Sequence, residues 1–167
     1  YVKRFGGTKV LLHYGGGSVV RSGLLYRVKT SLEKENIPYV MLGGVQPNPR
    51  SGLVYEGIEL CKKEGVDFVL AVGGGSTIDS AKAIAAGAIY KGDFWDYFSG
   101  QHIDKALPVG TILTIAAAGS EGSIGAVITN PKTNSKYDIL TPLIRPKFAI
   151  LNPALTLSLP NYHTFCG

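Results

Sequence analysis

Short apolar runs alternate along the chain with longer segments in which apolar residues recur every three or four positions. The runs have the length of buried strands, and the longer segments have the spacing of helices with one apolar face. This alternation is typical of an α/β fold, in which helices cover both faces of a parallel sheet. The predicted strands are KVLLHY (9–14), YVMLGG (39–44), DFVLAV (67–72), ALPVGTILT (106–114) and KFAILNP (147–153), and the predicted helices cover 19–35, 51–64 and 77–90.

Two segments between these elements do not fit the alternation. QPNPR (46–50) predicts a loop, because each proline lacks a backbone donor and keeps the residue before it out of the helical region. AVIT (126–129) and KYDIL (136–140) flank the turn-forming sequence NPKTNS (130–135), which predicts a β-hairpin. No linker or change of composition divides the chain, so we expect one domain over residues 1–167.

The sequence GGGS occurs twice, at Gly15–Ser18 and at Gly73–Ser76, each time between a predicted strand and a predicted helix. The first N–H groups of a helix lack intrahelical partners and carry partial positive charge, and glycine lets an anion come close. A strand, a glycine turn and a helix together can therefore hold a phosphate. A purely structural turn is the alternative. Ser76 and Asp79 also fit a capping box in which Ser76 is the N-cap.

Composition and charge narrow the class of protein. Hydrophobic residues make up 45% of the chain and charged residues 17%, which is typical of a soluble globular protein. No apolar run reaches the roughly 18 residues that a membrane span needs. The net charge is +5, but the basic residues are scattered. This distribution predicts a solvated basic surface that attracts small anionic ligands, and no nucleic-acid or membrane partner.

Cysteine and histidine residues give no sign of a metal centre. Cys61 and Cys166 have neither metal nor disulfide spacing, so we expect a reducing, cytoplasmic location. His13, His102 and His163 have no metal-ligand companion at useful spacing. We therefore expect structural or solvated roles for the three histidines.

Five blocks of the sequence resemble, in order, those of the iron-containing (group III) alcohol dehydrogenases. The blocks are VLLHYGGGSVVRSGLL, GGVQPNPR, FVLAVGGGSTIDSAKAIA, TILTIAAAGSE and FAILNP. They are most similar to the branch of NAD(P)H-dependent butanol dehydrogenases and broad-range aldehyde reductases. The resemblance implies a Rossmann-like dinucleotide-binding domain from a larger two-domain enzyme. The family's all-helical metal-binding domain, with its aspartate and histidine ligands for Fe²⁺ or Zn²⁺, would lie outside this chain.

The same resemblance implies NADP or NAD as the cofactor and assigns residues to it. The pyrophosphate would lie on Gly73, Gly74, Gly75 and Ser76, with Asp79 in the same helix turn. Gly15, Gly16 and Ser18 would lie under the adenosine ribose. No acidic residue stands there to repel a 2′-phosphate, which predicts a preference for NADP(H). The remaining expected contacts are Thr114, Ser120, Ser123 and Lys136 on the nicotinamide side, Asn48 at the adenosine end, and Leu155.

For the full-length enzyme the resemblance implies reversible oxidation of primary alcohols to aldehydes. Hydride would pass to the nicotinamide and a divalent metal would polarise the substrate oxygen. A homodimer is expected, and this chain alone would hold no catalytic residue. Ala118 departs from the family, which has a threonine on the cofactor at that position. A polyol or glycerol dehydrogenase, a dehydroquinate-synthase-like lyase and a non-catalytic nucleotide-binding module stay open as alternatives.

Overall fold

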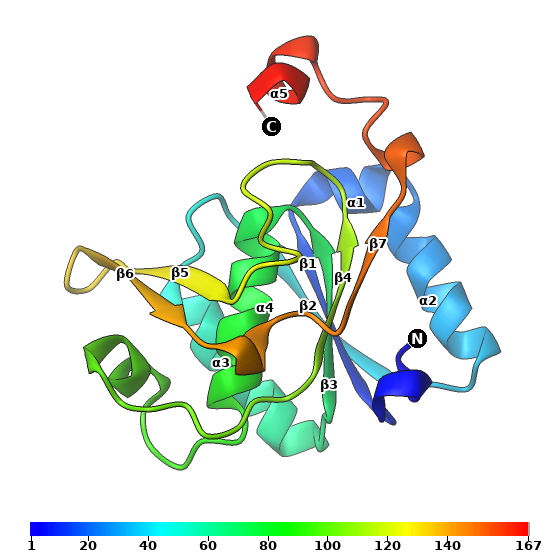
Figure 1. Ribbon diagram of the computed structural model, residues 1–167. Coiled ribbons are helices and arrows are strands. Elements are labelled where there is room, and N and C mark those ends of the chain that lie inside the picture. Colours follow the sequence, from blue (N-terminus) through cyan, green and yellow to red (C-terminus); the bar gives the residue numbers. More distant parts are fainter. Residues whose placement is uncertain (167) are drawn as a thin grey trace.

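The computed structural model describes residues 1–166 and contains a central sheet of five parallel strands (Figure 1). The strands lie side by side in the order β2-β1-β3-β4-β7, and every neighbouring pair is parallel. The predicted α/β fold with a parallel sheet is therefore confirmed. The bounds are β1 Val10–Gly15, β2 Tyr39–Val45, β3 Phe68–Gly73, β4 Val109–Leu113 and β7 Phe148–Leu151.

Helices cover both faces of this sheet, as the apolar pattern predicts. Figure 1 shows α2 (Leu24–Lys34) on one side, and α3 (Ser51–Glu64) and α4 (Gly75–Gly87) on the other. The pleat of the central strand β3 divides its side chains between the two layers. Val69 and Ala71 pack with α3 and α4, whereas Leu70 packs with α2. Every residue of β3 is buried, which explains its uninterrupted apolar run.

The segment predicted as one helix over 19–35 is two helices, so that prediction is wrong in detail. The first, α1 (Gly17–Arg21), ends before Gly23, and α2 begins directly after Gly23. Gly23 has a φ of +72°, in the left-handed region that glycine adopts at little cost and other residues avoid. Within α1, Val19 is buried and Val20 is 54% exposed.

The predicted hairpin is present and stands apart from the main sheet (Figure 1). Its strands β5 (Gly125–Asn130) and β6 (Ser135–Leu140) pair antiparallel. Ala126 and Ile139 bury their side chains in a third apolar cluster that includes Ala86 of α4. The N–H of Thr129 also donates to the carbonyl of Pro49 at 2.8 Å. These contacts attach the hairpin to α4 and to the predicted loop at 46–50.

Several short helical elements escaped prediction, because one or two turns give no measurable periodicity. One of them, η2 (Phe94–Ser99), is capped by Asp93, whose side chain accepts from the N–H of Trp95. Among residues 1–166, no helix has both the length and the apolar character that crossing a bilayer requires. The other short elements are η1 Lys3–Phe5, η3 Pro142–Ile144, η4 Pro153–Leu155 and α5 Asn161–Cys166.

Candidate functional site

The two GGGS turns lie at the same edge of the sheet, because β1 and β3 are parallel neighbours and both end there. A pocket of about 670 Å³ opens at this edge. Its walls also include the loop after β2, the end of β4 and the segment around η4. Most of the predicted cofactor residues meet in this one pocket. They are Gly15, Gly16, Ser18, Gly73, Gly74, Gly75, Ser76, Thr114 and Leu155.

The second turn, between β3 and α4, has no room for a side chain at Gly73 or Gly74. A Cβ on Gly73 would lie 2.5 Å from Thr77 Oγ1, and one on Gly74 would lie 2.6 Å from Ile115 Cγ2. The first intrahelical hydrogen bonds of α4 run from the N–H groups of Thr77 and Ile78 to the carbonyl of Gly74. The N–H groups before these two make no hydrogen bond within the helix, and the positive end of α4 faces the pocket.

The predicted capping box does not form. The N-cap is Gly74, in an extended conformation, and no side chain caps α4. Because the helix begins at Gly75, Ser76 already lies inside its first turn. The Asp79 carboxylate instead accepts hydrogen bonds from Ser120 Oγ at 2.5 Å and from the N–H of Val127 at 3.2 Å. Asp79 therefore connects α4 to the loop after β4 and to the hairpin.

Ser120 and Ser123 belong to a buried cluster around a residue that the sequence reading missed, Lys82. The ammonium of Lys82 donates to the carbonyl oxygens of Ser120 and Gly125 at 2.6 and 2.8 Å, and to Ser123 Oγ at 3.0 Å. Burial lowers the pKa of Lys82 to about 8, although Asp79 and Glu121 favour the charged form. A lone lysine within the alanine-rich stretch SAKAIAA was the signal that could have identified it.

Asn48 and Lys136 come from distant parts of the sequence and meet beside the pocket. Lys136 Nζ donates to Asn48 Oδ1 at 2.8 Å. Asn48 has a φ of +56°, a left-handed conformation that asparagine tolerates better than most residues. Pro47, its neighbour, lines the pocket. The structure thus brings together two residues that the sequence assigned to opposite ends of the cofactor.

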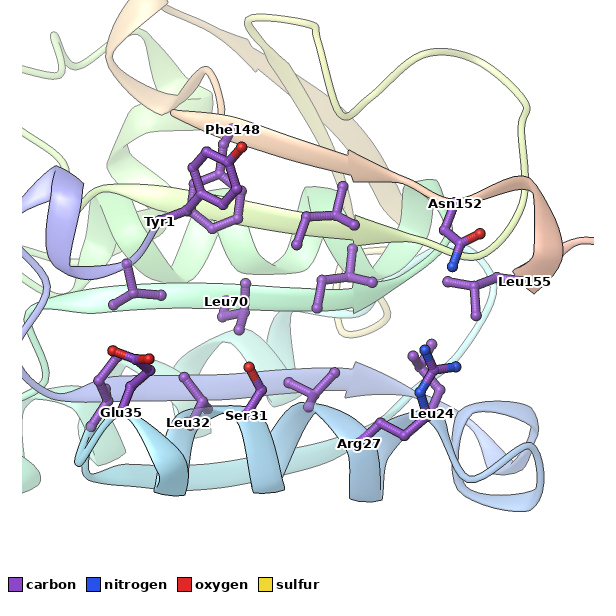
Figure 2. A pocket seen from close by; sticks show the side chains of 15 residues that line it. Tyr1, Leu24, Arg27, Ser31, Leu32, Glu35, Leu70, Phe148, Asn152 and Leu155 are labelled. Atoms are coloured by element: carbon purple, nitrogen blue, oxygen red, sulfur yellow. The ribbon is translucent and has the colours of Figure 1, made fainter.

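A second cavity, of about 310 Å³, lies between α2 and the sheet (Figure 2). Figure 2 shows Arg27, Leu24 and Leu155 at the end of this cavity where the strands terminate, and Glu35 at the opposite end. Arg27, Leu24 and Leu155 line the first pocket as well. Leu155 therefore lies where the two cavities adjoin, at the edge of the expected cofactor pocket.

The histidines occupy three different environments. His13 is fully buried. Its Nδ1 donates to the carbonyl of Leu42 at 2.9 Å, so its Nε2 accepts from Ser80 Oγ at 2.9 Å. Burial lowers the pKa of His13 to about 4. His13 thus has the structural role expected of it. His102 is exposed, and His163, although exposed, lies at the rim of the pocket, where the sequence reading did not place it.

The described residues do not fit the metal centre that the resemblance implies. Within residues 1–166, the His, Cys, Asp and Glu side chains form no group of three or more that could hold a metal ion. His13 is committed to its two hydrogen bonds on β2 and α4. Cys61 is a buried free thiol whose pKa burial raises to about 12, so it holds its proton near neutral pH.

Comparison with known proteins identifies the family. The sequence profile of the iron-containing alcohol dehydrogenases matches residues 1–153. "Probable NADH-dependent butanol dehydrogenase 1" of Bacillus subtilis is 52% identical over 162 residues, which are 96% of this chain and 42% of that protein. NADPH-dependent aldehyde reductase YqhD of Escherichia coli is 39% identical over 156 residues, 91% of this chain and 40% of that protein.

Solved structures agree with the sequence match. The crystal structure of NADH-dependent butanol dehydrogenase A from Thermotoga maritima superposes with a TM-score of 0.94 at 48% identity, over 98% of this chain and 41% of that one. The chain thus spans about two fifths of the length of the relatives it matches. Its glycine turns and parallel sheet are those of a Rossmann-like fold. The chain belongs to the iron-containing alcohol dehydrogenase family.

Proposed function

We propose that this chain binds the nicotinamide cofactor of an enzyme that interconverts primary alcohols and aldehydes by hydride transfer. The main support is the turn between β3 and α4, where glycines leave the backbone bare and the positive end of α4 faces the pocket. The Bacillus subtilis and Escherichia coli relatives are named as nicotinamide-dependent enzymes. The first name describes the dehydrogenation of an alcohol, and the second describes the reduction of an aldehyde.

The residues of the chain fit a dinucleotide in both shape and chemistry. The pocket volume of about 670 Å³ is that of a small-molecule site, which in proteins is roughly 300–1,000 Å³. Gly73, Gly74, Gly75 and Ser76 would hold the pyrophosphate, and Gly15, Gly16 and Ser18 would lie under the adenosine ribose. The other proposed contacts or supports of the bound cofactor are Asn48, Asp79, Thr114, Ser120, Ser123, Lys136 and Leu155.

The bound cofactor would supply the hydride donor or acceptor, while this chain fixes its orientation. Thr114 helps to hold the site rigid. Its N–H donates to the carbonyl of Gly73 at 3.1 Å and so joins the end of β4 to the glycine turn. At least part of the ligand set of the family's metal would need to come from outside residues 1–166, which hold no group of three or more suitable side chains. We further propose that the enzyme is a homodimer and works in the cytoplasm, where the free thiols of Cys61 and Cys166 stay reduced.

The pocket wall favours acceptance of a 2′-phosphate. Its lining contains Arg27 and, among the described residues, neither aspartate nor glutamate. The named relatives include both an NADH-dependent and an NADPH-dependent enzyme. A preference for NADP(H) is therefore part of our proposal, and the ratio of the dissociation constants for NADP⁺ and NAD⁺ tests it. A clear preference for NAD⁺ would overturn this part.

Calorimetric titration of the protein with NAD⁺ and NADP⁺ tests the binding function. Gly16 offers a sharp variant, because a Cβ there meets no atom within 4 Å and its φ of −70° suits any residue. Gly16→Asp should weaken NADP⁺ binding about tenfold or more by repelling the 2′-phosphate, and should affect NAD⁺ much less. Gly16→Asn, of the same size without the charge, is the control. Binding of neither cofactor would refute the proposal.

Activity distinguishes the proposed enzyme from a non-catalytic nucleotide-binding module. The polypeptide that carries this chain should reduce butanal with NADPH or NADH and oxidise butan-1-ol in the reverse direction, followed by the absorbance of the reduced nicotinamide. Glycerol and other polyols should be poorer substrates. Cofactor binding without oxidation of any alcohol would support the module instead.

A further inference from the structure

Lys82 lies in the middle of α4 and is fully buried, which is unusual for a lysine. Five oxygen atoms lie within hydrogen-bond distance of its ammonium. They are the carbonyl and hydroxyl oxygens of Ser120 at 2.6 and 3.2 Å, those of Ser123 at 3.1 and 3.0 Å, and the carbonyl oxygen of Gly125 at 2.8 Å.

Four of the five oxygens belong to the segment that connects β4 to the hairpin, and this segment contains no regular helix or strand. The fifth is the carbonyl oxygen of Gly125, the first residue of β5. The loop carbonyls lie outside any ladder or helix, although that of Ser120 also accepts from the N–H of Ser123 at 3.3 Å, and buried carbonyls left unpaired are costly. The three donors of the ammonium meet this need at one point. Lys82 thus supplies hydrogen-bond donors to these carbonyl oxygens, as backbone N–H groups do in the helices and strands.

The same loop forms part of the cofactor pocket. It begins at Thr114 and Ile115, which line the pocket on one side of the glycine turn. Ile115 Cγ2 approaches Gly74 closely, and the Cβ of Ser120 lies 3.9 Å from the Cβ position of Gly75. The start and the middle of the loop therefore both lie against the turn that would hold the pyrophosphate. Any displacement of the loop would move the wall of that site.

We propose that Lys82 is a positioning residue that, through Ser120, Ser123 and Gly125, holds the loop after β4 against the start of α4 and so shapes the cofactor pocket. This inference rests on the proposed function, because it concerns the same pocket. Lys82 is not among the described residues that line the pocket, so its effect on the cofactor passes through the loop.

The charge of Lys82 gives this role a pH signature. The charged groups that face it are Asp79 from α4 and Glu121 from the loop. Both favour the ammonium form, but burial dominates and brings the pKa to about 8. Loss of the proton removes one donor and the charge that attracts the carbonyl oxygens. Cofactor affinity should therefore fall as the pH rises from 7 to 9.

The test compares Lys82→Met, which keeps the length of the side chain but has no donor and no charge, with the wild-type protein. The matched control is Lys63→Met, because Lys63 is exposed on α3. Two quantities are measured for each protein. One is the hydrogen exchange of the amides of Ser123 in the loop and of Gly125 and Val127 at the start of β5, which are together called the loop amides. The other is the calorimetric affinity for NAD⁺ and NADP⁺ between pH 6.5 and 9.5.

In Lys82→Met we expect the loop amides to exchange at least about tenfold faster, while amides of β1 and β3 keep their protection. Cofactor affinity should fall about tenfold at pH 7, as is usual when hydrogen bonds to a charged group are lost. The fall of affinity between pH 7 and 9 should disappear. Lys63→Met should match the wild type in all three respects.

The inference is overturned if Lys82→Met keeps the loop exchange or the cofactor affinity of the wild type, or if it keeps the step near pH 8. If this variant does not fold, Ser123→Ala decides, because it removes one acceptor and leaves the charge. It should speed loop exchange and weaken binding by a smaller factor, with the pH step retained, and unchanged exchange would refute the inference. If the wild type binds neither cofactor, the proposed function fails, and loop exchange still decides whether Lys82 holds the loop.

Discussion

Gly74 and Ile115 lie so close together that a Cβ on Gly74 would come 2.6 Å from Ile115 Cγ2. Such a separation is far shorter than van der Waals contact, so an added methyl group forces either the turn or Ile115 to move. Both residues line the pocket at the start of α4. The close approach therefore couples the shape of the proposed pyrophosphate site to the position of the loop after β4.

We predict that Gly74→Ala weakens NAD⁺ and NADP⁺ binding about tenfold, because the displaced turn no longer presents its N–H groups in place. The free energy of unfolding should fall by about 1–3 kcal/mol, the usual cost of overpacking. Gly52→Ala is the matched control, since a Cβ on Gly52 of α3 meets no atom within 4 Å. Calorimetric titration and urea unfolding measure the two effects. Equal binding by the two variants would contradict the role of this turn.

The contact between Lys136 and Asn48 leads us to expect that a substitution of Lys136 changes cofactor affinity but hardly changes the free energy of unfolding. Both residues are exposed, so Lys136→Met should change the free energy of unfolding by no more than about 0.5 kcal/mol. If the pair contacts the cofactor as we propose, affinity should nevertheless fall several-fold. Lys132→Met in the turn of the same hairpin is the control. Titration of both variants checks the prediction, and equal affinities would remove Lys136 and Asn48 from the proposed site.

His13 predicts how stability depends on pH. Its pKa is about 4 in the folded protein against 6.5 for an ordinary histidine, so the unfolded chain binds more protons between these values. Stability from this residue is therefore complete above pH 6.5 and is lost as the pH falls toward 4, by about 3 kcal/mol in total.

Urea unfolding at several pH values tests this expectation. His13→Leu should be less stable at pH 7 by about 2 kcal/mol, because the carbonyl of Leu42 and the hydroxyl of Ser80 lose a partner. Its stability should fall less steeply between pH 6.5 and 4. His102→Leu, at an exposed position, should keep the wild-type slope. A His13→Leu variant with that same slope would show that His13 does not titrate on unfolding.

The strands of the sheet and the second glycine turn could be predicted because each depends on local sequence. FVLAV (68–72) is apolar throughout since β3 is buried on both faces, and the glycines that follow form a turn in which a Cβ on Gly73 would collide with nearby Thr77. The hairpin carried an equally local signal in NPKTNS. These features need no knowledge of distant contacts, so the pattern of residue types was sufficient.

The parts that escaped prediction depend on long-range contacts or on a single backbone conformation. The apolar spacing continues through Gly23, and only its left-handed φ shows that the helix breaks there. Asp79 fits a capping box locally, but the hydroxyl of Ser120 and the N–H of Val127 take its carboxylate. Lys82 finds its acceptors 38 to 43 residues further along the chain. The sequence around Lys82 therefore gives no indication of these partners.

Ala118 gives a prediction in which affinity should rise. It is exposed in the loop after β4, at a position where the family resemblance predicts a threonine that contacts the cofactor. Ala118→Thr should restore a hydrogen bond worth about 0.5–1.5 kcal/mol, which corresponds to a gain of roughly two- to tenfold in affinity. Ala118→Val is the control, because valine has the shape of threonine without the hydroxyl group. Titration with NAD⁺ should show tighter binding for the threonine variant only. If valine tightens binding equally, the gain comes from a stiffer loop, and if neither variant does, the cofactor does not reach this position.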